Sequence, residues 1–335
     1  MAITNDLLSS TLYSIRDGEV DELFKKIPFL DDAKRNGGIE YENGGIKIQR
    51  PLSVAEHSTI SQMVTGYEPV SLAVADVLKP AIYDWTDAVA PVVISKKEEL
   101  ENSGEKAIVK IVEARMRSVM SLLRRELNKQ IIAGTSATLT NMGTLNGIAP
   151  GTNKFFDDAA PGAGQTCVVG GLAKDTLNVP GFYNQYQTAG GSFNTGGLAA
   201  MHNLYTAANV ITPMGEIKSI IASTAAFANY KRALFANERY VDEKTLDGGR
   251  MVLAYAGSKV SADSDMPTTA GVVASMYFIN FDGVKMVIHK DGDFAVSPFE
   301  YISGTTARAA TVYFKGQLVA DHLGSCGLLV AGDAW

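Results

Sequence analysis

The sequence of 335 residues has little cysteine, little histidine and no long apolar run. Its two cysteines, Cys167 and Cys326, lie far apart and form no Cys-x-x-Cys motif, so neither a disulfide framework nor a zinc site is expected. No apolar run approaches the roughly 20 residues that a membrane-spanning helix needs, and the start of the chain has no basic region followed by an apolar one. We therefore expect no membrane partner, no secretory signal and synthesis in a reducing cytoplasm.

Motifs that would indicate catalysis are also absent. The "APGAGQTCVVGG" stretch (160–171) is glycine-rich but lacks the lysine of a phosphate-binding loop, and Cys326 has no neighbouring base. The four histidines stand alone, in no metal-binding spacing: His57, His202, His289 and His322. The sequence therefore predicts no catalytic residue, no cofactor and no metal site.

The charges are ordinary except on one segment. The net charge of −6 argues against a dedicated nucleic-acid binder. The acidic pairs are expected to be solvated, because adjacent side chains do not converge on one site: Asp31-Asp32, Glu98-Glu99 and Asp157-Asp158. Between residues 110 and 129, two acids, Glu113 and Glu126, accompany six bases: Lys110, Arg115, Arg117, Arg124, Arg125 and Lys129. These bases form either a solvated helix face or a surface turned toward a polyanion or an acidic neighbour.

That basic segment belongs to an unusually long predicted helix. An apolar stripe recurs at spacings of three and four: Ile108, Val112, Met116, Val119, Leu123, Leu127 and Ile131. Asn102 with Glu105 resembles a capping box, and Gly134 is a natural C′ residue. A helix of about thirty residues would be roughly 45 Å long. The stripe is expected to face the core.

Strands surround this helix. Alternation over 81–95 predicts a strand, in which Pro91 confines its part to an edge or a bulge. Together with the preceding extended segments, it predicts a two-stranded arm over roughly 40–95. Such a ribbon is marginal in water unless something covers it. Further on, the patterns predict a buried strand at 217–223, a helix at 224–236 and then mostly strands. Turns between paired strands are expected at three dipeptides: Asn43-Gly44, Asp282-Gly283 and Lys315-Gly316. The order of segregated helices and strands predicts an α+β fold.

Three stretches carry a family resemblance. "AIYDWTDAVAPVVISKKEELENSGEKAIVKIVEARMRSVMSLLRRELNKQIIAG" resembles the return strand of an extended loop running into a spine helix. "GGRMVLAYAGSKVSADSDMP" (248–267) is similar to a strand–Gly–x–x–Val–x–x–Asp–x–x–Met–Pro segment, with Gly257, Asp263 or Asp265, and Pro267 in place. "SMYFINFDGVKMVIHKDGDF" and "ARAATVYFKGQLVADHLGSCGLL" resemble closing strands. In this order they resemble the major capsid proteins of tailed bacteriophages, the HK-ninety-seven-type fold.

The resemblance implies a division of the chain. It comprises an N-terminal arm (1–39), an extended β-hairpin loop (40–101), a spine helix with the first part of a peripheral domain (102–160), an axial domain (161–270) and closing strands of both domains (271–335). The candidate inter-subunit contacts on the arm are Tyr83, Trp85, Lys96 and Lys97. Some family members form a lysine–asparagine cross-link, but nothing here identifies an asparagine to match Lys96 or Lys97.

The implied function is a coat protein that self-assembles through pentamers and hexamers into an icosahedral shell around double-stranded DNA. The implied partners are further copies of the chain, a separate scaffolding protein, a portal protein, a cement protein and non-specifically packaged DNA. The implied location is the virion capsid, after synthesis in the host bacterial cytoplasm. Two alternatives stay open: an encapsulin-like nanocompartment shell, and an α+β enzyme that uses the glycine-rich loops between Gly162 and Gly197.

Overall fold

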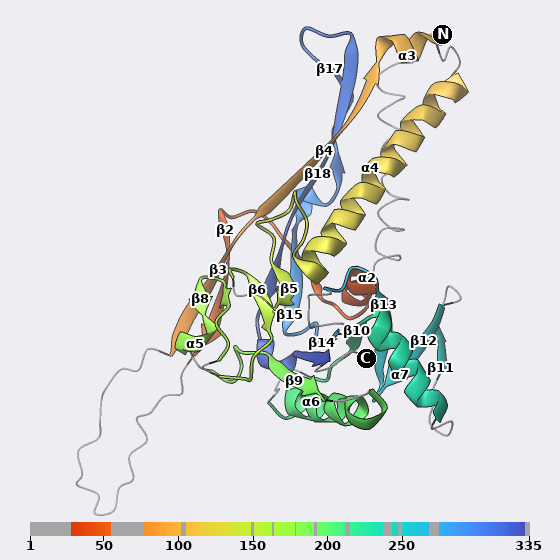
Figure 1. The fold of residues 1–335 in the computed structure, drawn as a ribbon. Helices are drawn as coiled ribbons and strands as arrows, with labels where there is room; N and C mark the ends of the chain where they lie inside the picture. The colour runs from red at the N-terminus through yellow and green to blue at the C-terminus, as the bar shows by residue number, and fades with distance from the viewer. Residues whose placement is uncertain are drawn as a thin grey trace, which may run out of the picture.

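A computed structural model describes residues 28–54, 77–101, 105–148, 151–162, 164–177, 179–190, 193–211, 215–236, 243–246, 250–267 and 275–331. The predicted helical segment before residue 28, the predicted cap at Asn102 and the side chain of Ile108 lie outside this description. The described residues form two large sheets, three two-stranded ribbons and a set of helices (Figure 1). The α+β prediction is confirmed.

The seven-stranded sheet is buried on both faces in its middle. Its strand order is β11-β12-β13-β10-β14-β19-β9, and every residue of β10, β14 and β19 is buried. Such strands are near-continuous apolar runs, because neither face meets water. The strands are β9 (Gln185–Ala189), β10 (Ser219–Ser223), β11 (Glu243–Leu246), β12 (Arg250–Tyr255), β13 (Ser258–Asp263), β14 (Ser275–Ile279) and β19 (Gly327–Ala331).

Two helices and the rest of the core cover the two faces of this sheet. Ile220, Phe278 and Leu329 project into a cluster with helices α6 (Leu198–Ile211) and α7 (Thr224–Ala236). The alternate residues of the same strands, such as Ile221 and Tyr277, join the larger cluster on the other side. Both the predicted strand at 217–223 and the predicted helix at 224–236 are confirmed.

The six-stranded sheet is built around one long strand, β18 (Ala307–Ala320). Strand β4 (Thr86–Ser95) pairs along one edge of β18. The other edge of β18 pairs successively with β15 (Val284–His289), β16 (Ala295–Val296) and β17 (Glu300–Tyr301), and β1 (Ile39–Glu42) extends the sheet parallel to β15. Among the described residues β4 pairs with β18 alone, so Pro91 lies in an edge strand as predicted.

Helix α4 (Glu105–Ala133) runs along this sheet and rises beside β4 and β18 (Figure 1). Its 29 residues give a length of about 44 Å. The stripe residues Val112, Met116, Leu123, Leu127 and Ile131 are buried and Val119 is partly buried, which confirms the predicted core face. The helix ends at Gly134, whose φ of 68° and N–H bond to the Gln130 carbonyl (3.0 Å) match an αL C-cap.

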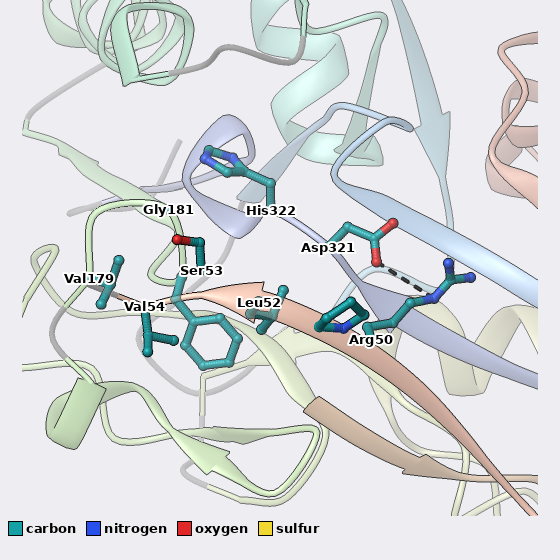
Figure 2. Close-up of a pocket in the computed structure, with 10 residues that line it drawn as sticks. Arg50, Leu52, Ser53, Val54, Val179, Gly181, Asp321 and His322 are labelled. Carbon is teal, nitrogen blue, oxygen red and sulfur yellow. Dashed lines mark ion pairs between the residues drawn. The ribbon is translucent and has the colours of Figure 1, made fainter. Parts of the chain in front are cut away.

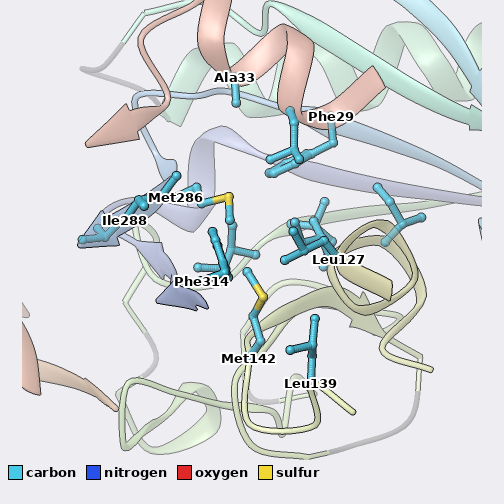
Figure 3. Close-up of a cluster of buried hydrophobic side chains, with 14 of the residues drawn as sticks. Phe29, Ala33, Leu127, Leu139, Met142, Met286, Ile288 and Phe314 are labelled. Atoms are coloured by element: carbon cyan, nitrogen blue, oxygen red, sulfur yellow. The ribbon is translucent and has the colours of Figure 1, made fainter. Parts of the chain in front are cut away.

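The large cluster under α4 joins distant parts of the chain. Figure 3 shows Leu127 of α4 in one cluster with Phe314 and Met286 of the six-stranded sheet, with Phe29 of helix α2 (Pro28–Arg35) above them. The remaining described elements are the arm strands β2 (Lys47–Ser53) and β3 (Leu78–Asp84), the ribbons β5 (Thr144–Gly147) with β6 (Lys154–Asp157) and β7 (Val168–Val169) with β8 (Leu172–Ala173), the helices α3 (Lys96–Glu101) and α5 (Lys174–Leu177), and the turns η1 (Phe193–Gly197), η2 (Lys290–Gly292) and η3 (Leu323–Ser325).

All three predicted hairpin turns are wrong. Strand β1 pairs with β15 and β2 with β3, so Asn43-Gly44 does not connect two paired strands. At Asp282-Gly283 the chain leaves one large sheet for the other, since β14 and β15 have different partners. Residues 315 and 316 lie inside the continuous strand β18.

At two of these positions, 283 and 316, glycine is needed because neighbouring atoms lie too close for a Cβ atom. A Cβ on Gly283 would lie 2.2 Å from the His322 carbonyl oxygen, and one on Gly316 would lie 2.8 Å from the Phe314 ring. A glycine inside a strand pattern marks such close approach as well as a turn. The predicted single strand over 81–95 is likewise wrong: the structure has two strands there, because the extended pairing is interrupted at Trp85, between β3 and β4.

Candidate functional site

No enzyme-like centre emerges in the described parts of the chain. Within them, no three His, Cys, Asp or Glu side chains are grouped to hold a metal ion, and no helix is long and apolar enough to cross a membrane. His57 lies outside the described residues, and the other three histidines are on separate elements: His202 on α6, His289 at the end of β15 and His322 after β18.

One cavity of about 390 Å³ lies at the root of the arm. Figure 2 shows Leu52, Val54 and Val179 on its apolar side, and Arg50, Asp321 and His322 on its polar side. Arg50 is paired with Asp321 across 3.7 Å, and burial lowers the pKa of His322, which favours the neutral ring. The lining holds one hydroxyl, Ser53, and one imidazole, His322, but among the described residues no hydrogen bond joins them, so the geometry does not indicate a reaction.

Charged side chains around that cavity fasten the arm to the six-stranded sheet. Arg50 of β2 contacts Glu40 and lies 3.3 Å from Glu42, both on β1. Lys285 of β15 reaches Glu40 at 2.7 Å and Asp321 at 3.4 Å. Burial alone would raise the pKa of Glu40, but hydrogen bonds from Lys285 and Arg50 outweigh it and lower that pKa. These ion pairs therefore hold the β2 end of the arm against the six-stranded sheet.

The arm itself has two different faces. Ile48 and Leu52 of β2 and Ala81 and Tyr83 of β3 are buried against the body. The opposite face is open to solvent, with Leu78 62% exposed and Ile82 43% exposed. Together with exposed Pro51 and Pro80, these residues form an apolar surface on the arm that the described part of the chain leaves uncovered.

The four predicted contact residues of the arm lie in different surroundings. Tyr83 is fully buried, and its hydroxyl donates to the Ala320 carbonyl at 3.3 Å, so its side chain is not available to a neighbouring subunit and that prediction does not fit. Burial raises the pKa of Tyr83. Trp85 is half-buried and donates from Nε1 to the Gly45 carbonyl at 3.0 Å. Lys96 and Lys97 begin α3 at the far end of β4, half-buried and exposed respectively.

The predicted basic residues of α4 do not share one environment. Arg115 turns toward β4, where it contacts the Val93 carbonyl and pairs with Glu98 at 2.5 Å. Lys129 pairs with Glu126 at 3.5 Å. Positions 110, 117 and 124 are seven residues apart and lie close to one line along the helix, since seven residues are nearly two turns. The side chain of Lys110 lies outside the described residues, Arg117 and Arg125 are exposed, and Arg124 is half-exposed.

Sequence reasoning missed two buried ion pairs. Asp157 is buried and lies 3.1 Å from the Nζ of Lys174, which also donates to the Phe155 carbonyl (2.6 Å) and to Asn184 Oδ1 (2.9 Å). Burial lowers the pKa of Lys174, while Asp157 opposes that shift. Asp32 is likewise buried and pairs with Lys259 at 2.5 Å. The prediction that adjacent acids are solvated is therefore wrong for Asp32 of the Asp31-Asp32 pair and for Asp157 of the Asp157-Asp158 pair.

Comparison with known proteins supports the fold from a separate direction. No family model matches the sequence, and no curated protein matches it. Among solved structures, the chain is similar to the subunit of the cyanophage A-1(L) capsid (16% identity, 92% of this chain and 93% of that chain, TM-score 0.60). It is also similar to the capsid of Myoviridae phage XM1 (13%, 89% and 91%, 0.54) and to the SrpI encapsulin complex of Synechococcus elongatus (12%, 87% and 84%, 0.50).

These likenesses span nearly the whole chain at sequence identities too low to reveal more than the fold. They fit the arrangement described above, in which a long helix lies along a narrow sheet, an arm projects from its base, and a second sheet carries two helices. The chain therefore has the fold of tailed-bacteriophage major capsid proteins, the HK-ninety-seven-type fold.

Proposed function

We propose that this chain is the major capsid protein of a tailed bacteriophage. Copies of it would assemble through pentamers and hexamers into an icosahedral shell that encloses double-stranded DNA. The observation that carries the proposal is the likeness to a capsid subunit over 92% of this chain. The exposed apolar face of the arm supports self-association, because surfaces of this kind mark protein–protein contacts.

The decisive experiment is to express the chain alone and examine it by electron microscopy and sedimentation. Closed shells, tubes or rings of five or six subunits are expected. A compact monomer at concentrations that favour assembly would overturn the proposal. Scaffolding, portal and cement proteins belong to the same proposal, and co-expression with a candidate scaffold tests whether particles become more uniform in size.

The second candidate is an encapsulin-like compartment shell, favoured by the likeness to the SrpI encapsulin complex. The two functions differ in content. Particles purified from the native source would contain nuclease-protected DNA if the chain is a phage capsid protein. They would contain a protein cargo and no DNA if it forms a compartment.

An enzymatic role in the glycine-rich loops has less support. The polar side chains that converge there, Asp157, Gln165, Lys174 and Asn184, are buried and bonded to one another. A substrate site needs such groups to be accessible. We therefore propose that the chain is not an enzyme and that its virion location follows from its role in the shell.

We further propose that the open side of α4 faces the packaged DNA. Arg124 and Arg125 carry this proposal, since they lie outside the apolar stripe and keep solvent exposure. Reversing both charges to Glu should leave shell assembly intact and lower the DNA content of purified particles. Lys290→Glu, a reversal on the exposed turn η2, is the control and should leave the content unchanged. Normal DNA content in the double variant would contradict this orientation.

A further inference from the structure

Lys174 is a buried lysine with more than an ion-pair partner beside its amine. Its Nζ lies 2.6 Å from the Phe155 carbonyl oxygen, 2.9 Å from Asn184 Oδ1 and 3.1 Å from Asp157 Oδ2. Asp157 and Asn184 are themselves buried. One amine, one carboxylate and one carboxamide are therefore held together away from water, and we call Lys174, Asp157 and Asn184 the buried triad.

The hydrogen bonds of Asn184 fix which way its carboxamide faces. Its Nδ2 donates to the Asp157 carbonyl at 3.0 Å and to the Gln185 carbonyl at 3.1 Å. Its Oδ1 accepts from the Asp157 N–H at 2.9 Å. A flipped amide would lose all three bonds, because an oxygen cannot donate to a carbonyl. The amine of Lys174 therefore faces the carbonyl end of the carboxamide, where an amine can attack.

Three different segments position the buried triad. Asp157 ends β6, Lys174 begins α5 and Asn184 directly precedes β9. Gln165 supports the triad from the backbone side, since its Oε1 accepts from the Asn184 N–H at 3.2 Å and its Nε2 donates to the Asn184 carbonyl at 2.7 Å. Supporting hydrogen bonds of this kind hold reacting groups in a fixed geometry.

The amine is close enough to the carboxamide carbon to react with it. Cγ is one C=O bond, about 1.2 Å, from Oδ1, so at most about 4 Å separates it from Nζ. Reacting atoms lie about 3–3.5 Å apart before a bond forms, so a side-chain movement of about 1 Å is enough. Burial lowers the pKa of Lys174 and so favours the neutral amine, which is the nucleophilic form.

The backbone of Asp157 is placed to stabilise the charge that such an attack creates. Attack on Cγ puts negative charge on Oδ1, and the Asp157 N–H already donates to that atom at 2.9 Å. This is the donor distance typical of oxyanion stabilisation. The carboxylate of the same residue contacts Nζ. Asp157 therefore serves both the oxyanion and the amine.

We propose that Lys174 and Asn184 join within each chain through an isopeptide bond, with Asp157 carrying the protons. The Asp157 carboxylate takes a proton from the Lys174 ammonium, and the neutral Nζ forms a bond to Asn184 Cγ. The Asp157 carboxyl then gives its proton to Nδ2 and takes the second proton from Nζ. The Cγ–Nδ2 bond breaks and ammonia leaves. Atoms and charges balance without an oxidant or a second reactant.

The product relieves the cost of a buried ion pair. An ammonium and a carboxylate are expensive to hold away from water, even when they are paired. After the reaction a neutral amide lies beside a neutral carboxyl, and both can hydrogen-bond. Ammonia diffuses away, so the reaction proceeds in one direction.

The bond lies inside one chain and not between subunits, because all three members of the buried triad are inaccessible. It differs in this respect from a link through Lys96 or Lys97 on α3. It fastens the start of α5 to β9, the last strand in the order of the seven-stranded sheet. The reaction occurs once in each chain, so it is no enzyme activity. The inference does not depend on the proposed shell function.

The first test is the mass of the wild-type chain, purified folded and then denatured. It should be lighter than the mass of its sequence by one ammonia. Trypsin should fail to cleave after Lys174, and chymotrypsin cleavage after Phe182 or Tyr183 should leave two peptides joined through Lys174 and Asn184. A mass equal to that of the sequence would overturn the inference, whether or not the chain assembles.

The second test excludes another source of ammonia, which is closure of Asn184 on its own backbone. Lys174→Arg keeps the positive charge but cannot form the amide, so it should have the full mass of its sequence. Loss of ammonia from Lys174→Arg would show that Asn184 reacts without the lysine and would overturn the inference.

The third test concerns the proton carrier. Asp157→Ala should slow the loss of ammonia by about 100-fold or more, because proton transfer by a positioned side chain contributes about that much. Asp158→Ala is the matched control, since Asp158 is the exposed neighbour and its variant should be fully linked. Full linkage of Asp157→Ala would overturn the role of Asp157. If Asp157→Ala does not fold, the wild-type and Lys174→Arg masses still decide whether the bond exists.

Discussion

The seven-stranded sheet and the arm with β4 differ in how completely they bury their apolar side chains. Strands β10, β14 and β19 are buried at every residue, because α6 and α7 cover one face and the α4 cluster covers the other. The arm and β4 bury alternate residues and leave Leu78 and Val89 more than half exposed. The first region completes its core within one chain. The second leaves apolar side chains exposed on the described surface.

Among substitutions in the buried core, Lys174→Met should cause the largest loss in the free energy of unfolding. The substitution leaves Asp157 buried without its cation, and breaking a buried ion pair in this way costs about 3–5 kcal/mol. Denaturant unfolding of the unassembled subunit measures the loss. The double variant Lys174→Met/Asp157→Leu should be less destabilised than the single one, and a larger loss in the double variant would contradict this account.

A second pair of variants contrasts the two regions directly. Leu329→Ala in β19 opens a cavity in the closed core and should lower the free energy of unfolding by about 2–5 kcal/mol. Leu78→Ala removes the same atoms from the exposed arm and should change it by at most about 0.5 kcal/mol. The same denaturant titration serves both. Similar losses at the two positions would erase the proposed difference between the regions.

A smaller effect is expected at the end of α4. Gly134 has a φ of 68°, and a Cβ there would lie 3.0 Å from Thr144 Cγ2. Gly134→Ala should therefore lose about 1–2 kcal/mol, the cost of a left-handed conformation for an ordinary residue, plus the crowding against Thr144. Gly171→Ala is the control, because its φ is 77° and nothing lies within 4 Å of its added Cβ. Equal melting temperatures of the two variants would show that the crowding has no cost.

The smallest effect concerns the junction of β4 with α4. The hydrogen bond from Arg115 is the main cause that lowers the pKa of Glu98 to about 2, with backbone and hydroxyl bonds at Ser95 adding to it. A lowered carboxyl pKa contributes stability above the ordinary value of 4.5, and this contribution is lost as the pH falls toward 2. Glu98→Gln should thus melt slightly lower than wild type at pH 7, with a difference that shrinks by pH 3. A difference that grows on acidification would contradict the assignment.

Features set by local periodicity were predictable from the sequence. Helix α4 ends at Gly134 as expected, and α7 occupies the predicted residues 224–236, because the apolar positions of a helix recur every three or four residues. Glycine was ambiguous, since neither Gly283 nor Gly316 forms a hairpin turn: Gly283 lies against the His322 carbonyl, and Gly316 lies against the Phe314 ring and the Val287 carbonyl. The burial of Asp32 could not be foreseen, because its partner Lys259 lies 227 residues away.

The sequence by itself determined the long helix, its buried stripe and the apolar runs that became fully buried strands. The tertiary structure decided which strands pair, which acids are buried and which apolar residues of the arm and β4 stay exposed. The physical reason is that periodicity belongs to a short stretch of chain, whereas pairing and burial depend on contacts between stretches far apart. Leu78 and Leu329 are the same residue type and both lie in strands, and the elements packed around each one leave Leu78 exposed and place Leu329 in the core.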